Sequence, residues 1–108
     1  MHELSVVRAL LTRLKPYQHR EICRITVEVG AMSCVDGERL QFCFDMVKKE
    51  AGLSGAELVI QVVPARAECR HCGRHFTPDK PGDACPCSSH DYTLTSGRQL
   101  LLTEIGFG

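Results

Sequence analysis

The chain lacks the features that mark membrane proteins, exported proteins and nucleic-acid-binding proteins. No apolar run approaches the roughly 18 residues that a membrane-spanning helix requires. The sequence opens with His2 and Glu3, where an export signal would have a basic stretch followed by an apolar one. Thirteen Lys and Arg residues balance thirteen Asp and Glu residues, so no net charge attracts a polyphosphate. We therefore expect a cytoplasmic protein with no membrane insertion and no nucleic acid as a partner.

Tryptophan is absent and aromatic residues make up only 6% of the chain, yet enough apolar material is present for a core. Hydrophobic residues account for 44% and charged residues for 24%, as in ordinary globular proteins. A length of 108 residues accommodates one domain and a small appendage, which excludes a large multidomain enzyme.

Apolar periodicity predicts a helix, a strand, a second helix and a second strand, in that order. Leucine and valine recur at helical spacing over residues 3–15, and β-branched residues alternate with polar ones over 21–30. Asp36 is placed to cap the second helix, and Gly52 and Gly55 are placed to end it. Residues 57–63 are too continuously apolar for a surface strand, so we expect this strand to be buried.

The composition then changes to short polar stretches rich in Gly, Pro and Cys, which cannot build a core and need a metal to hold them together. An apolar pattern returns over residues 98–106, and we expect this strand to rejoin the main sheet. The predicted fold is α+β or α/β, with a sheet of about three strands packed with two helices and a rubredoxin-like zinc knuckle, or zinc ribbon, as an insertion. We place the α/β domain at residues 1–64 and 93–108 and the zinc-binding domain at residues 65–92.

Four of the seven cysteines form two close pairs, Cys69 with Cys72 and Cys85 with Cys87. Two short chelates joined by a loop suit a tetrahedral Zn²⁺ ion, and four thiolates leave no open position for a substrate, so the pattern predicts a structural zinc site. The second pair is Cys-x-Cys instead of the commoner Cys-x-x-Cys, which leaves His90 as an alternative fourth ligand. Two disulfides are a further alternative, which a reducing compartment disfavours.

The other three cysteines stand alone in the sequence. Cys43 lies on the apolar stripe of the second helix and Cys23 at the start of a strand, so we interpret these two and Cys34 as small core residues. No Ser/His/Asp or Cys/His pairing has a spacing that indicates catalysis. The sequence therefore does not predict an enzyme.

The opening residues Met1-His2-Glu3 are the second group of candidate metal ligands. A free α-amino group, the amide nitrogen of His2 and its imidazole can close two adjacent chelate rings around one cation. Nitrogen ligands in a plane suit Ni²⁺ or Cu²⁺, and Glu3 adds an oxygen. The positive end of the first helix opposes a cation here, so a solvated chain end is the alternative interpretation.

Several segments form a combination that points to one family. They are Met1-His2-Glu3-Leu4-Ser5, Glu28-Val29-Gly30 running into Ser33-Cys34-Val35-Asp36, Phe42-Cys43-Phe44, and the loop with the paired cysteines. Over essentially the whole chain this combination resembles the HypA/HybF nickel-incorporation proteins of [NiFe]-hydrogenase maturation.

The resemblance implies a metallochaperone, not an enzyme, that takes Ni²⁺ as cargo at its amino terminus. It also implies delivery to the [NiFe]-hydrogenase large subunit, with a HypB-type nickel GTPase as a partner. His2 is the implied nickel ligand, with the Met1 amine and Glu3 beside it. Asp36 matches an acidic residue found near the nickel site in some members, although an N-cap role would also explain it. The paired cysteines match the family's structural zinc ligands.

Two other functional interpretations remain at this point. A zinc-ribbon module that binds nucleic acid or protein gains support from basic residues around the knuckle, and the neutral total charge weighs against it. A small hydrolase built on the opening residues lacks a third rigid ligand. The last strand, if its edge is exposed, would also permit a homodimer.

Overall fold

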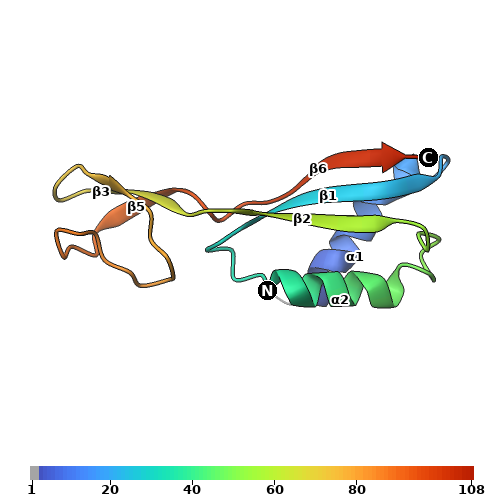
Figure 1. Cartoon of the computed structure of the whole chain (residues 1–108), viewed down its shortest axis with the longest axis horizontal. Coiled ribbons are helices and arrows are strands. Elements are labelled where there is room, and N and C mark those ends of the chain that lie inside the picture. Colours follow the sequence, from blue (N-terminus) through green and yellow to red (C-terminus); the bar gives the residue numbers. More distant parts are fainter. Residues whose placement is uncertain (1–2) are drawn as a thin grey trace.

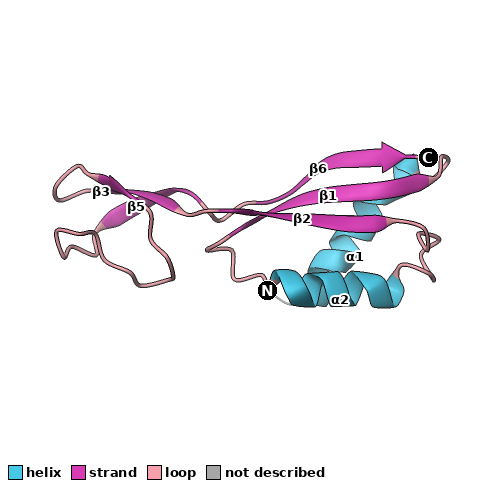
Figure 2. Ribbon diagram, viewed as in Figure 1, coloured by secondary structure: helices cyan, strands magenta, loops and turns pink. Residues whose placement is uncertain are grey.

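The computed structural model describes residues 3–108 and has two lobes joined by a narrow waist (Figure 1). Its extents are 52 × 21 × 16 Å, and its radius of gyration of 16.9 Å exceeds the roughly 13 Å expected for a compact chain of this length. The larger lobe holds both α-helices, and the smaller lobe is built from short strands and loops (Figure 2). Among the described residues, no helix is long and apolar enough to cross a membrane.

Both predicted helices form in the larger lobe. Helix α1 spans Glu3–Leu14 and passes into a 3₁₀ helix, η1, at Lys15–Tyr17. Pro16 lies in η1, where its fixed φ angle is tolerated and its missing N–H ends the α-helical hydrogen bonding. Helix α2 spans Gly37–Val47 and so ends before Gly52 and Gly55, the residues that were predicted to end it.

The main sheet has three strands in the order β2-β1-β6. The central strand β1 (Ile22–Gly30) pairs in parallel with β2 (Glu57–Val63) and antiparallel with β6 (Leu100–Phe107). The prediction that the last apolar segment returns to this sheet is therefore confirmed. Both helices cover the same face of the sheet (Figure 2), which makes the fold α+β.

The core lies between this face and the two helices. In β1 the side chains of Ile25, Val27 and Val29 are buried, as period-two alternation predicts. From the helices, Leu14 and Phe44 are fully buried against them. This packing holds α1 and α2 against the sheet, and Glu3 of α1 and Asp36 before α2 belong to the candidate nickel site described below.

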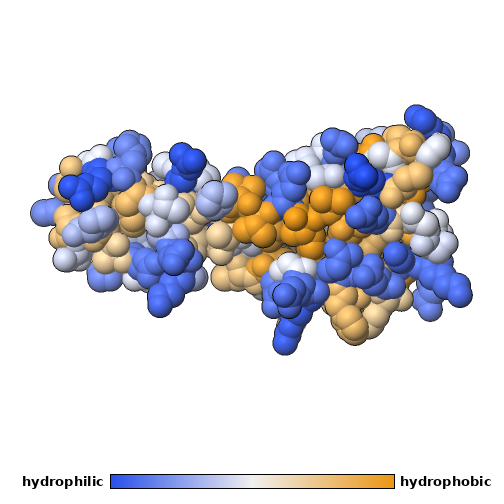
Figure 3. Space-filling model, in the orientation of Figure 1, coloured by the Kyte–Doolittle hydropathy of each residue, from blue (hydrophilic) through white to orange (hydrophobic). Residues whose placement is uncertain are grey.

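The prediction that residues 57–63 form a buried strand is wrong. Strand β2 is an edge strand with β1 as its sole neighbour in the sheet, and the Val62 side chain is 66% exposed. An apolar run signals burial only when both faces of a strand are covered, and the helices cover just one face here. Figure 3 shows apolar side chains gathered on the larger lobe close to the waist.

A second sheet, which the sequence did not predict, forms the smaller lobe. Its strands are β3 (Arg66–Cys69), β4 (His75–Phe76) and β5 (Tyr92–Ser96), in the antiparallel order β4-β3-β5. Strand β5 carries this sheet beyond residue 92, where the sequence placed the end of the insertion. Ala67 and two of the cysteines supply most of the buried side chains, so the lobe has little apolar core of its own.

Candidate metal centres

The four paired cysteines lie on two tight turns that face each other in the smaller lobe. Cys69 ends β3, and the turn that contains Cys72 closes with a hydrogen bond from the Gly73 N–H to the Cys69 carbonyl oxygen, at 3.0 Å. The second turn closes with a 2.7 Å bond from the Ser88 N–H to the Cys85 carbonyl oxygen. Ser88, which follows Cys87 and closes this turn, has a positive φ of 76°, which is uncommon for a residue with a side chain.

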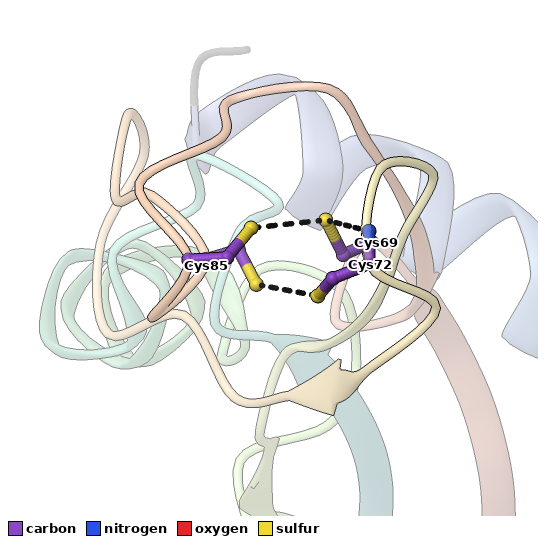
Figure 4. Close-up of side chains that lie close together, drawn as sticks. Cys69, Cys72 and Cys85 are labelled. Carbon is purple, nitrogen blue, oxygen red and sulfur yellow. Dashed lines mark hydrogen bonds between the residues drawn. The ribbon is translucent and has the colours of Figure 1, made fainter.

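The sulfur positions fit a tetrahedral ion. The four Sγ atoms lie within 4.8 Å of one another, with 3.7 Å between those of Cys69 and Cys87 and 3.6 Å between those of Cys72 and Cys85 (Figure 4). A tetrahedral Zn²⁺ ion with bonds of about 2.3 Å holds its sulfur ligands about 3.8 Å apart. These cysteines are free thiols in the structure, and both sulfur separations exceed the roughly 2.05 Å of a disulfide bond, so the geometry favours the metal site over two disulfides. His90 is exposed and does not belong to the group.

The surroundings of Cys69 and Cys85 shift the pKa values of these two thiols in opposite directions. The pKa of Cys69 falls from 9.0 to about 6, chiefly because the Cys72 backbone N–H donates to its Sγ atom at 3.4 Å. Burial raises the pKa of Cys85 from 9.0 to about 12. Metal coordination requires the thiolate, so a bound dication has to displace the proton of Cys85. Four thiolates around one ion make a closed, structural type of site.

The second candidate centre lies at the start of the described chain. The structure brings Glu3 and Asp36 together, because the Asp36 backbone N–H donates to Oε2 of Glu3 at 3.3 Å. This contact joins the first turn of α1 to the start of α2. The predicted nickel ligands Met1 and His2 lie outside the described residues.

Asp36 is the N-cap of α2, as predicted. Its Oδ1 atom accepts hydrogen bonds from the backbone N–H groups of Glu38, at 2.9 Å, and Arg39, at 3.4 Å. The positive ends of two helix dipoles meet at this place, which would repel a cation. The carboxylates of Glu3 and Asp36 lie at these two helix beginnings and offset that positive charge.

Substitutions at Asp36 should distinguish the role of its side chain as a helix cap from the role of its negative charge. Asp36→Ala removes the cap and is expected to lower the free energy of unfolding by about 1 kcal/mol, whereas Asp36→Asn keeps an acceptor oxygen and should cost only a few tenths. Urea unfolding followed by circular dichroism measures both values. If both variants kept the free energy of unfolding of the parent protein, Asp36 would not be acting as a cap.

The interpretation of all three single cysteines as core residues holds only in part. Cys43 and Cys23 are half-buried, and Cys43 packs against the core. Cys34 is exposed in the loop before α2 and has a positive φ of 63°. Positive φ is uncommon for a residue with a side chain, and nothing in the local sequence pattern signals it.

Known proteins are similar to this chain over nearly its full length. The family described as "Hydrogenase/urease nickel incorporation, metallochaperone, hypA" matches residues 1–107. The chain belongs to the HypA family. The resemblance seen in the sequence motifs is therefore confirmed.

Individual HypA proteins align along most of their length. The hydrogenase maturation factor HypA of Nostoc sp. (strain PCC 7120) is 35% identical over 106 residues, covering 97% of this chain and 94% of the relative. That of Geobacter metallireducens is 34% identical over 107 residues, covering 97% of each. The solution structure of the Ni metallochaperone HypA from Helicobacter pylori superposes with a TM-score of 0.66 and 27% identity, covering 99% of this chain and 97% of that one.

Proposed function

We propose that this HypA chain is a nickel metallochaperone that carries Ni²⁺ at its amino terminus and holds Zn²⁺ permanently at its four paired cysteines. The contact between Asp36 and Glu3 carries the proposal, because it holds the carboxylate of the residue that directly follows the predicted nickel ligands Met1 and His2 in the sequence. The family description supports nickel as the cargo.

The two ligand sets differ in chemistry, so we propose a different role for each. The amine of Met1, the imidazole of His2 and the carboxylate of Glu3 would form an exposed nickel site that can release its ion at handover. The paired cysteines would form a closed site, and zinc bound there would link the two turns of a lobe that has little core. Neither set offers a rigid open position for a substrate, so we do not propose an enzyme.

The proposed recipients follow from the family. We propose that the chain passes nickel to the [NiFe]-hydrogenase large subunit and cooperates with a HypB-type nickel GTPase. Strand β6 is an edge of the main sheet and β2 is the other edge, so backbone groups on both sides are available for pairing with a second copy in a homodimer.

Complementation tests the delivery function directly. A strain without this chain should lose hydrogenase activity in low-nickel medium, and the parent gene should restore it. The His2→Ala variant should fail to restore activity at low nickel but succeed when nickel is abundant, because excess ion bypasses a carrier by mass action. Full restoration by His2→Ala at low nickel would contradict the proposed site.

Nickel binding should depend steeply on pH. Imidazole and amine donors bind a metal only when unprotonated, and the ordinary pKa of histidine is about 6.5, so nickel affinity should fall below about pH 6.5. Nickel titrations of the zinc-loaded protein from about pH 8 to about pH 5.5, with zinc content checked at each step, measure this. An affinity that stays constant over that range would exclude imidazole as a ligand.

A further inference from the structure

Three segments of backbone cross at the waist between the lobes (Figure 1). The end of β1 is hydrogen-bonded to both links that run into the smaller lobe. The Gly30 N–H donates to the Gln99 carbonyl oxygen at 2.7 Å, and the Ala31 N–H donates to that of Val63 at 2.8 Å. The Met32 N–H donates to the Gly97 carbonyl oxygen at 2.6 Å. The crossing thus ties together parts of the chain that are far apart in sequence.

The crossing has no room for two side chains. A Cβ atom added at Gly30 would overlap the carbonyl group of Gly97. A Cβ atom added at Gly97 would lie 2.5 Å from Cα of Ala65, and Gly97 also has a positive φ of 107°. Only glycine permits backbones to approach so closely, so both positions require it.

The same segment leads directly to the candidate nickel site. After the crossing, the Ser33 N–H donates to the Gly30 carbonyl oxygen at 3.0 Å, forming a turn, and the Val35 N–H donates to Oγ of Ser33 at 3.3 Å. Asp36 follows, caps α2 and donates its N–H to Glu3. The loop is therefore short and fixed at both ends, with the glycine crossing at one end and the Glu3 contact at the other.

We propose that Gly30 and Gly97 are positioning residues for the nickel site. Their contact sets the place of residues 31–35, and through them the place of the Glu3 and Asp36 carboxylates, although neither glycine is a ligand. This inference rests on the proposed site at the amino terminus. It predicts that a change at the waist alters nickel binding while the zinc-binding cysteines keep their ion.

Gly30→Ala is the primary test, with Gly55→Ala as the matched control because a Cβ atom at Gly55 meets nothing within 4 Å. Zinc-loaded proteins are titrated with Ni²⁺, and the absorption spectrum of the bound nickel is recorded together with zinc content. Gly30→Ala should bind nickel about tenfold more weakly and with an altered spectrum, while retaining one zinc. Gly55→Ala should match the parent in all three measurements.

A second pair of variants covers the case in which Gly30→Ala does not fold. The buried Gly97 N–H donates to Oε1 of Gln99 at 2.7 Å. Gln99→Leu removes this acceptor without adding bulk at the crossing and should weaken nickel binding severalfold, whereas Gln99→Glu keeps an acceptor and should restore it.

The outcomes separate this inference from the proposed function. Nickel affinities and spectra within twofold of the parent for Gly30→Ala and Gln99→Leu, alongside lost binding in His2→Ala, would overturn the positioning role and leave the nickel site standing. Unchanged binding in His2→Ala would instead overturn the proposed site.

Discussion

Cys69→Ser is expected to abolish zinc binding and to unfold the smaller lobe while the larger lobe stays folded. Cys69 is 1% exposed, its sulfur faces that of Cys87 at 3.7 Å, and few other buried side chains hold β3, β4 and β5 together. Structural zinc sites contribute on the order of 10–16 kcal/mol of binding energy to folding, far more than this lobe's apolar burial can supply. The larger lobe has its own core and its own sheet.

Amide hydrogen exchange with parallel measurement of zinc content checks this result. In Cys69→Ser, the amides of β3 and β5 should exchange almost as fast as in an unfolded chain, while those of β1 stay protected. Cys34→Ser is the matched control, because Cys34 is exposed and outside the cysteine group, and it should keep one zinc and parental exchange rates. Protected β3 amides in a zinc-free Cys69→Ser protein would show that the lobe folds without metal.

His2→Ala is expected to weaken nickel binding by at least about 100-fold without affecting zinc. Loss of a residue that merely supports a metal ligand costs 10–100-fold in affinity, so loss of a ligand that closes a chelate ring should cost at least the upper part of that range. His19→Ala serves as the control, since His19 is exposed near the opposite end of α1 and its Nδ1 atom pairs with the Pro16 carbonyl oxygen. Calorimetric titration of the zinc-loaded proteins measures the three affinities. Nickel binding by His2→Ala within threefold of the parent would place the ion elsewhere.

Local patterns predicted most of the larger lobe. The apolar stripes located α1 and α2, alternation located β1, and the capping role of Asp36 followed from its place before an amphipathic segment. Each of these features depends on residues close together in the sequence. Period and capping signals act over that range, so a single sequence contains them.

Features that depend on the placement of distant segments could not be predicted. The exposure of Val62 depends on which strands lie beside β2, and the length of its apolar run does not reveal that. The close approach of Gly30 to Gly97 joins the last residue of β1 to the link between β5 and β6, and glycine alone does not indicate what it approaches. The small second sheet was missed because β4 is only two residues long and leaves no periodic signal.

In the candidate sites, too, local features could be predicted from the sequence and contacts between distant segments could not. Cysteine spacing predicted the four-sulfur group, since chelating pairs are local features. The hydrogen bond from Asp36 to Glu3 joins the beginnings of two helices and arises from tertiary packing. The family resemblance supplied the nickel role of the opening residues, which their chemistry alone left open.

A nickel titration of the zinc-loaded protein, beside a variant with one additional residue before Met1, tests whether the nickel site is built on the amino terminus. The added residue displaces the α-amino group from the chelate ring but leaves His2, Glu3 and the cysteines in the chain. We expect one nickel per chain for the native start and loss of that site in the extended protein, with zinc retained in both. Equal nickel binding by the two proteins would contradict a site built on the amino terminus.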